Sequence, residues 1–225
     1  HVMPRIDRSL FNEILVVDGH STDGTVEYCQ QQGLKVLFQP NKVLFDAQEH
    51  GLRNTTSDVI VIFSPDGNAL PEALPSMCEA MREGYDIVVG SRYCAGAKSE
   101  DDDFFTAFGN RFFTGLINLL FGAQFTDALV GLRAYRRDAL QRMDFEAMSR
   151  RSWLRRHYLW MNSWEVAASC RAPRLGLKVK EVPASEPPRV GGVRKLSILR
   201  NGLGALVQIL CDFLFYHPPR SRRQP

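Results

Sequence analysis

Residues 13–33 read EILVVDGHSTDGTVEYCQQQG, and this stretch joins a strand pattern to a helix pattern. Within segment 13–18, residues 14–17 are apolar and rich in β-branched side chains, which is typical of a buried β-strand. The part that follows carries Asp23 near its start and Gly33 at its end, residue types that favour the beginning and the end of a helix. The stretch therefore predicts a strand that passes directly into a helix, with Asp18 at the junction.

The same alternation continues through the first half of the chain. Further strands are predicted at residues 34–40, 58–63 and 85–92, and further helices at 45–56 and 71–84. Apolar strands that alternate with helices predict an α/β fold, with a mostly parallel sheet flanked by helices. The carboxyl ends of parallel strands meet at one edge of the sheet, where ligands bind. Polar, glycine-containing segments follow three of the predicted strands, at residues 18–21, 64–68 and 90–92.

The second half of the chain has a different character. A helix rich in Phe and Leu is predicted at residues 101–122, a short strand and a helix start at 133–140, a strand at 175–184, and a basic Pro/Gly loop at 185–195. The three acids at 101–103 suit the positive end of a helix, an interpretation that we favour over a metal cluster. Five side chains follow helical spacing closely enough for a core or a membrane-facing patch: Phe104, Phe105, Phe108, Phe112 and Phe113. Three tryptophans beside clustered arginines indicate either a membrane-interface belt or a packed helix with a basic face: Trp153, Trp160 and Trp164.

The last predicted helix, at residues 196–215, bears on membrane association. It is long enough to cross a bilayer. Arg200, Gln208 and Asp212 argue against crossing, since a central charge costs roughly 2.5–3.5 kcal/mol. The three fall near one face at helical spacing, which favours an amphipathic helix in the membrane interface, with packing on the protein's own core as the alternative.

Composition sets broad limits on the class of protein. The chain has 225 residues, 44% of them hydrophobic and 24% charged, and a formal net charge of +3. These values fit a globular protein and give no reason to expect a nucleic-acid partner. The five cysteines form no CxxC pair, which indicates reduced thiols in a cytoplasmic setting. No secretory signal is apparent near His1, and the abrupt entry into a strand predicts that a segment precedes it.

Two acids at strand ends are candidates for chemistry. Asp18 could accept hydrogen bonds from a nucleobase or ribose, although helix capping nearby would explain the same pattern. Asp66 stands in a turn that Pro65 stiffens and Gly67 makes permissive. A divalent ion on substrate phosphates needs only one or two protein carboxylates, and Asn68 could add a neutral oxygen. A plain Pro-Asp-Gly turn is the alternative.

Several motifs together resemble glycosyltransferase family 2, which has the GT-A fold. VVDGHSTDGT at residues 16–25 resembles the family's VVDDGSTDGT-type motif, SPDGN at 64–68 occupies the place of its DxD motif, and VVGSRY at 88–93 matches its next segment. DALVGLRAYRRDAL at 127–140 and LGLKVKEVPASEPPRVGGVRKLS at 175–197 resemble the polyprenyl-phosphate sugar transferase branch, which is similar to dolichyl-phosphate mannose synthase. The resemblance covers about residues 12–200.

The resemblance implies inverting transfer of a sugar from a nucleotide diphosphate sugar to a polyprenyl phosphate or glycan acceptor. It implies Mg²⁺ or Mn²⁺ as the cofactor and a peripheral position on the cytoplasmic face of a membrane. By resemblance, residues 1–195 form the catalytic domain, while 196–225 form an amphipathic helix and a basic tail.

The implied site residues fall into four groups. They are Asp18, Ser21, Asp66 and Arg92 for the nucleotide sugar, Asp66 and Asn68 for the metal, Asp127 and Arg133 for catalysis at the acceptor side, and Arg189, Arg194 and Lys195 for an acceptor loop. Asp127 would either orient or deprotonate the acceptor, and Arg133 has the fork of donors that suits a phosphate.

Two departures from the family pattern leave other functions open. The family's first strand, with its P-x-[YF]-N-E motif, is missing, and Ser64 stands where the first acid of the DxD motif is usual. These departures predict altered metal dependence or an inactive relative. The alternatives are thus a catalytically silent nucleotide-sugar-binding module and a sugar nucleotidyltransferase, which shares the sheet.

Overall fold

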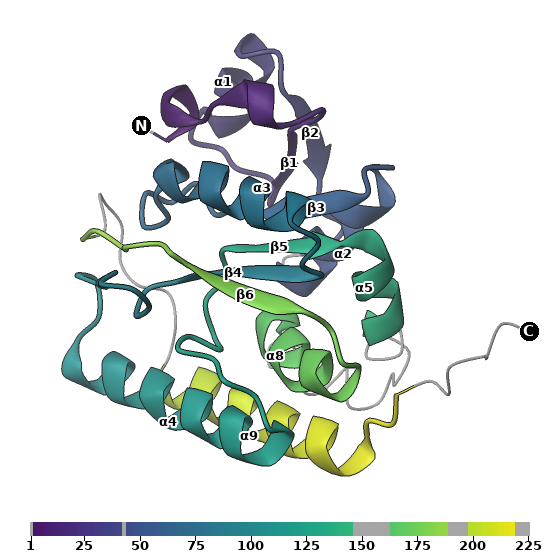
Figure 1. Ribbon diagram of the computed structural model, residues 1–225. Coiled ribbons are helices and arrows are strands. Elements are labelled where there is room, and N and C mark those ends of the chain that lie inside the picture. The colour runs from purple at the N-terminus through teal and green to yellow at the C-terminus, as the bar shows by residue number, and fades with distance from the viewer. Residues whose placement is uncertain (1, 42–43, 146–162, 189–197, 219–225) are drawn as a thin grey trace, which may run out of the picture.

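The computed structural model describes residues 2–41, 44–145, 163–188 and 198–218, and its helices pack around β-sheets (Figure 1). The strands are β1 (Leu15–Asp18), β2 (Lys35–Phe38), β3 (Val59–Ile62), β4 (Ile87–Ser91), β5 (Arg133–Arg136) and β6 (Val179–Pro183). The helices are α1 (Thr25–Gln31), α2 (Leu44–Arg53), α3 (Leu74–Arg82), α4 (Phe104–Phe121), α5 (Arg137–Met143), α8 (Trp164–Arg174) and α9 (Ile198–Phe215). Short 3₁₀ turns lie at Met3–Arg5, Arg8–Leu10 and Pro71–Ala73. The strands and helices expected in the first half of the chain are confirmed, whereas α8 was not predicted.

The larger sheet contains four strands in the order β3-β5-β4-β6. β4 and β6 are parallel, while β5 runs antiparallel to both β3 and β4, so β3, β4 and β6 all point the same way. β5 thus departs from the predicted parallel arrangement. Arg133 at its start pairs with Ile62 and with Val89, near the ends of β3 and β4. The loop before β5 therefore lies at the carboxyl edge of the sheet, while β1 and β2 form a separate parallel pair.

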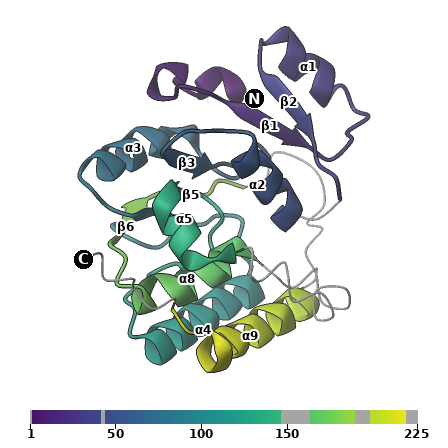
Figure 2. The same cartoon turned by 90° about the vertical axis from the view of Figure 1, so that its right-hand side faces the viewer.

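The core lies on both faces of β4, which is fully buried. Ile87 and Val89 face one hydrophobic cluster, which includes side chains from α4, α8 and α9. Val88 faces the other, which is built mainly on α3. Figure 2 shows α3 on one side of the sheet and α4, α8 and α9 on the other. The side chains of Ile87, Val88 and Val89 face alternate sides because successive residues of a strand point to opposite faces. Packing on both faces holds β4, and with it the segment that follows its last residue, in place.

Gly90, in β4, is closely surrounded. A Cβ atom there would lie 2.8 Å from Leu132 Cδ2, 2.9 Å from Leu132 Cγ and 3.1 Å from Ala184 Cβ. Because such overpacking forces neighbouring side chains and backbone to shift, we expect Gly90→Ala to lower the free energy of unfolding by about 1–3 kcal/mol. Urea unfolding measures this difference. Gly109→Ala in α4 is the matched control, because a Cβ there meets nothing within 4 Å, and equal values for the two variants would contradict the prediction.

Two polar side chains of α9 point inward, whereas Arg200 is exposed. Gln208 and Asp212 are buried, and they bond to the Ser163 backbone and to Arg171 of α8, with a 2.8 Å contact between Arg171 Nη2 and Asp212 Oδ1. Arg174 of α8 donates to backbone carbonyl oxygens in the last turn of α9 and just after it. These contacts show that Gln208 and Asp212 pack against the protein's own core, which was the alternative expectation for this helix, whereas contact of α9 with a membrane stays a prediction.

Two further expectations about membrane contact are affected by the packing. Trp164 is buried and its ring stacks on Phe145 at 4.9 Å, so it belongs to the core and not to an interface belt. Trp153 and Trp160 lie outside the described residues. Among the helices that the structure describes, none combines the length and the apolar character needed to cross a membrane.

Candidate active site

An ion pair between Arg92 and Asp127 forms the centre of the candidate site. Arg92 follows β4, and Asp127 lies in the loop before β5. The Arg92 Nε donates to Asp127 Oδ2 at 2.7 Å, its Nη2 donates to Oδ1 at 3.0 Å, and its backbone N–H donates to Oδ2 at 3.2 Å. Asp127 is fully buried. Both carboxylate oxygens are thus engaged by one guanidinium in the bidentate geometry that gives strong, directional pairs.

Other acids surround the same arginine. Arg92 Nη1 donates to Glu186 Oε2 at 3.2 Å and lies 3.9 Å from Asp102 Oδ1. Burial by itself lowers the pKa of the Arg92 guanidinium, but the hydrogen bond and charge of Asp127, together with the charge of Glu186, outweigh it and raise that pKa above its ordinary value. Arg92 is therefore a permanent cation, held in place at the carboxyl edge of the sheet.

Glu181 of β6 fixes the turn that carries Asp127. Its carboxylate accepts the backbone N–H of Thr126 at 2.9 Å and that of Asp127 at 3.0 Å. The Thr126 hydroxyl contacts the Ser91 hydroxyl at 2.6 Å, which joins this turn to the end of β4. Glu181 was missed by the sequence reasoning. A glutamate inside the strand predicted at residues 175–184 was the available signal, because a charge that is partly buried in a sheet needs a partner.

The turn after β3 presents oxygen ligands. Asp66 is exposed and accepts the Asn68 backbone N–H at 3.2 Å, and Gly67 takes the left-handed conformation at φ 88°. The Asn68 amide donates to Asp101 at 2.9 Å and to Glu186 at 3.4 Å. Its carbonyl oxygen Oδ1 is buried and has no hydrogen-bond partner.

This oxygen set fits a hard divalent cation in part. An exposed carboxylate on Asp66 and an unpartnered amide oxygen on Asn68 are donors that such ions prefer. Across the described ranges, no group of three or more His, Cys, Asp or Glu side chains is arranged to hold a metal. The remaining ligands would therefore have to come from water and from substrate phosphates, as is common for magnesium.

Asp18 ends β1 and is buried, and its Oδ1 accepts the Ser21 backbone N–H at 2.7 Å. The neighbouring Asp23 accepts the N–H and the hydroxyl of Thr25 at the start of α1. Both acids thus support local turns, whereas the N-cap of α1 is Gly24 and no side chain caps the helix, so the capping interpretation is not confirmed. The role of Asp18 and Ser21 toward a nucleotide stays a prediction.

Arg133 is placed differently from the expectation. It is buried, and its guanidinium donates to the carbonyls of Val130 at 2.9 Å and Ala128 at 2.8 Å and to the Ser169 hydroxyl at 3.0 Å. The expectation that Arg133 faces an acceptor phosphate is thus corrected, because its donors hold the loop before β5. The predicted acceptor-loop residues Arg189, Arg194 and Lys195 lie outside the described residues.

The three acids before α4 serve separate partners. Asp103 accepts the Thr106 backbone N–H at 2.7 Å and caps the helix, which confirms the helix-start interpretation. Asp101 accepts from Asn68, and Asp102 accepts from the Tyr93 hydroxyl. The acids therefore do not converge on one point, as a metal cluster would require.

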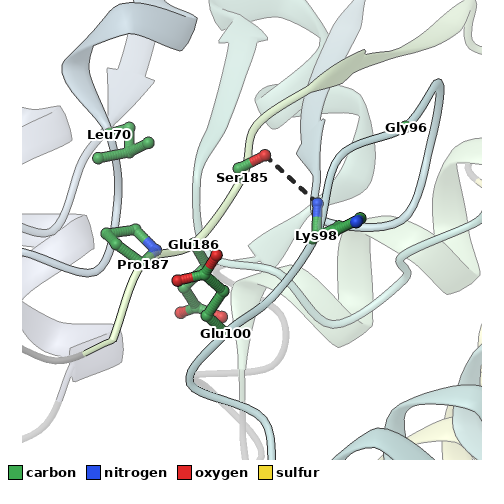
Figure 3. A pocket seen from close by; sticks show the side chains of 7 residues that line it. All are labelled: Leu70, Gly96, Lys98, Glu100, Ser185, Glu186 and Pro187. Atoms are coloured by element: carbon green, nitrogen blue, oxygen red, sulfur yellow. Dashed lines mark hydrogen bonds between the residues drawn. The ribbon is translucent and has the colours of Figure 1, made fainter.

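A shallow hollow of about 220 Å³ lies beside Glu186, which contacts Arg92 (Figure 3). It is lined by Leu70, Gly96, Lys98, Glu100, Ser185, Glu186 and Pro187. The backbone N–H of Lys98 donates to the Ser185 hydroxyl at 3.3 Å across its wall. Glu186 belongs both to the lining and to the contacts of Arg92, so the hollow adjoins the candidate site.

Comparisons with known proteins point to one family and one fold. Residues 7–144 match the family model described as glycosyl transferase family 2. An undecaprenyl-phosphate mannosyltransferase of Micrococcus luteus is 30% identical over 197 residues, which cover 83% of this chain and 76% of that protein. A polyprenol monophosphomannose synthase of Mycolicibacterium smegmatis is 28% identical over 208 residues, covering 88% and 72%. The crystal structure of glucosyl-3-phosphoglycerate synthase from Mycobacterium tuberculosis with Mn²⁺, UDP-glucose and glycerol 3-phosphate has a TM-score of 0.67 at 18% identity, covering 92% and 72%.

Proposed function

The chain belongs to glycosyl transferase family 2 and has the GT-A fold, and from this premise we propose that it moves a hexose from a nucleoside diphosphate sugar to a polyprenyl phosphate, with inversion at the anomeric carbon. The observation that carries the proposal is the placement of Arg92 between Asp127 and Glu186, where the Asp66 turn also meets the edge of the sheet. A cation and oxygen ligands side by side suit a departing diphosphate.

The proposed mechanism divides the work among these residues. Arg92 stabilises negative charge on the leaving diphosphate, and Asp127 holds the guanidinium in the required orientation. Asp66 and Asn68 Oδ1 are the residues that would hold Mg²⁺ or Mn²⁺, which would supply Lewis-acid charge toward the donor phosphates. Asp18 and Ser21, at the end of β1, bind the nucleoside of the donor.

The engagement of Asp127 favours a phosphate acceptor over a glycan. A sugar hydroxyl must lose a proton to a base as it attacks, whereas the oxygen of a polyprenyl phosphate is already anionic. Asp127 is fully buried, and both of its oxygens accept from Arg92, so it is poorly placed to receive that proton. Arg189, Arg194 and Lys195 would supply positive charge for the acceptor phosphate. The names of the two relatives, both polyprenyl-phosphate enzymes, point in the same direction.

The layer formed by α4 and α9 supports a peripheral position on a membrane, for which we propose the cytoplasmic face. Both helices run side by side along one face of the molecule (Figure 1). Large apolar side chains are exposed on them: Phe104, Phe105, Phe108, Phe112 and Leu119 on α4, and Leu203, Leu210, Phe213, Leu214 and Phe215 on α9. Exposed apolar surface of this extent marks an interaction site, and a lipid surface is where a polyprenyl acceptor resides.

Replacing Phe108 and Phe112 together by Asp should weaken binding to phospholipid vesicles at least tenfold. The reason is that each buried Phe contributes about 1.5–3 kcal/mol, and about 1.4 kcal/mol is a factor of ten. Vesicle co-sedimentation measures the partition. Phe38→Asp in β2, at the opposite end of the molecule from α4 and α9, is the control (Figure 1). Equal partition of the double variant and the wild type would argue that this face binds another protein.

The function is tested by direct transfer. The full protein is incubated with UDP- or GDP-hexoses, Mg²⁺ or Mn²⁺, and vesicles that contain a polyprenyl phosphate, with a soluble glycan acceptor in a parallel arm. The expected product is a lipid-linked hexose, with an anomeric configuration opposite to that of the donor. Nucleotide-sugar binding without transfer to either acceptor would favour the silent binding module. Family membership leaves the sugar nucleotidyltransferase without support.

A further inference from the structure

Glu186 completes the set of carboxylates on the Arg92 guanidinium. Asp127 accepts from Nε and Nη2, and Glu186 accepts from Nη1 at 3.2 Å. Each of the three side-chain nitrogens therefore already donates to a carboxylate. A guanidinium has five N–H donors and these contacts use three of them, so a phosphate that approaches Arg92 through the second N–H of Nη1 or Nη2 meets a carboxylate already bound at the same nitrogen. Glu186 is the more accessible partner, because its side chain is 19% exposed, whereas the Asp127 side chain is fully buried.

The position of Glu186 is built into the fold. Its backbone N–H donates to the Lys98 carbonyl at 2.9 Å, and its own carbonyl accepts from Glu100 N–H at 2.8 Å. Its carboxylate also accepts from the Ser99 hydroxyl at 2.7 Å and from the Asn68 amide at 3.4 Å. These contacts extend β6 past its last residue and point the side chain at Arg92. The Glu186 carboxylate thus links the end of β4, the turn after β3 and the segment around Ser99.

Among the described residues, the charged side chains that contact Arg92 are all acids. Three carboxylates, those of Asp102, Asp127 and Glu186, lie within 3.9 Å of the one guanidinium, which gives a local sum of +1 − 3 = −2. A free nucleoside diphosphate is itself strongly anionic, so it is repelled by the excess of acids. A diphosphate that carries a divalent cation has two fewer negative charges, and the repulsion falls accordingly.

We propose that Glu186 is a specificity-determining residue of the donor site, which occupies Arg92 and excludes nucleotides that arrive without a divalent cation. The inference rests on the proposed function, because it takes Arg92 to be the cation that binds the donor diphosphate. The cation-bound diphosphate binds Arg92 beside the Glu186 carboxylate, while Asp127 keeps the guanidinium in place. The dependence of nucleotide binding on a metal ion is thus set partly by a residue that is not itself a metal ligand.

The test compares Glu186→Gln with Glu100→Gln by calorimetry of UDP and GDP binding, in Mg²⁺ and in EDTA. Glu100 is exposed and its backbone is hydrogen-bonded to Glu186, so its variant removes the same charge nearby (Figure 3). Because like charges in contact cost several kcal/mol, Glu186→Gln should tighten binding in EDTA at least tenfold and change binding in Mg²⁺ less than about threefold. Glu100→Gln should keep the wild-type ratio of the two dissociation constants. Thermal unfolding of both variants establishes that they are folded.

The outcomes separate this inference from the function on which it rests. If the wild type binds a nucleotide in Mg²⁺ and Glu186→Gln keeps the wild-type ratio of the dissociation constants in EDTA and in Mg²⁺, the proposed specificity role of Glu186 is overturned. The proposed donor site is then retained. Weaker binding by Glu186→Gln in both conditions also overturns the specificity role, because Glu186 would then be a support for Arg92. If neither the wild type nor Glu186→Gln binds UDP or GDP under any condition, the proposed donor site is wrong, and the specificity role of Glu186 is wrong with it.

Discussion

Asp127→Asn is expected to lower the turnover of sugar transfer by about a hundredfold or more, and to weaken nucleotide binding as well. The amide has one oxygen and no charge, so it cannot accept the bidentate pair from Nε and Nη2 of Arg92. The guanidinium then loses the partner that orients it toward the diphosphate. Transfer assays give turnover, and calorimetry with the nucleoside diphosphate in Mg²⁺ gives the affinity.

Arg92→Lys is the matched variant for this prediction. Lysine keeps the positive charge but lacks the planar fork, so it cannot reproduce a bidentate pair. If Asp127 acts through Arg92, the two single variants should have similar effects, and the double variant should lose little more than either alone. A loss of turnover with unchanged nucleotide affinity in Asp127→Asn would contradict this role. It would instead make Asp127 a base and favour a sugar hydroxyl as the acceptor.

Asp212→Ala should lower the free energy of unfolding by about 3–5 kcal/mol, a large part of the total stability of a typical domain. The Asp212 carboxylate accepts from Nε and Nη2 of Arg171, and both side chains are buried between α8 and α9. Removing the acid leaves a buried cation without its charged partner, and this costs more than the lost bond. Urea unfolding followed by circular dichroism measures the change.

Two further variants sharpen the test of this ion pair. Glu79→Ala removes one partner of an exposed pair on α3 and should cost no more than about 1 kcal/mol. Replacing the buried pair as a whole, with Arg171→Met and Asp212→Leu together, should recover most of the stability lost in Asp212→Ala, because no buried charge remains. A double variant as unstable as Asp212→Ala would show that the loss comes from packing and not from the unpaired charge.

The first half of the fold could be predicted from the sequence because its periodicity is simple. Short apolar runs alternate with capped helical segments, and the strand ends that carry Asp18, Asp66 and Arg92 follow directly from that order. The direction of β5 could not be predicted in the same way. Its sequence indicates a strand, but its antiparallel placement depends on where the chain returns to the sheet after α4.

Helix α8 was missed for a different physical reason. Nearly all of its residues, from Trp164 to Ala172, are buried, so it has no polar face and shows no amphipathic period. Pro173 near its end also argues against a helix on sequence grounds. A helix that is buried on all sides is recognisable only from the elements that surround it.

In the candidate site, the sequence predicts which residues lie at the edge of the sheet but not the direction in which their side chains point. Arg92 and Arg133 both stand beside apolar strands at the same edge, yet one meets the acids of the site and the other bonds to Ala128, Val130 and Ser169. Packing against residues that are distant in the sequence decides which way each guanidinium points, so a local sequence motif does not predict that direction. Glu186 had no signal of its own, since its partners come from segments distant in sequence.

The inward polar face of α9 has a mechanical consequence. Asp212 of α9 grips Arg171 of α8, and Ser169 of α8 bonds to the Arg133 guanidinium and to the Ala128 carbonyl, next to Asp127. These hydrogen bonds connect the outer helix to the residue next to the acid that holds Arg92. A protein bound to lipid through α4 and α9 would therefore hold Arg92 at a defined distance from the bilayer surface. The phosphate of the acceptor would have to extend from the bilayer by that distance to react.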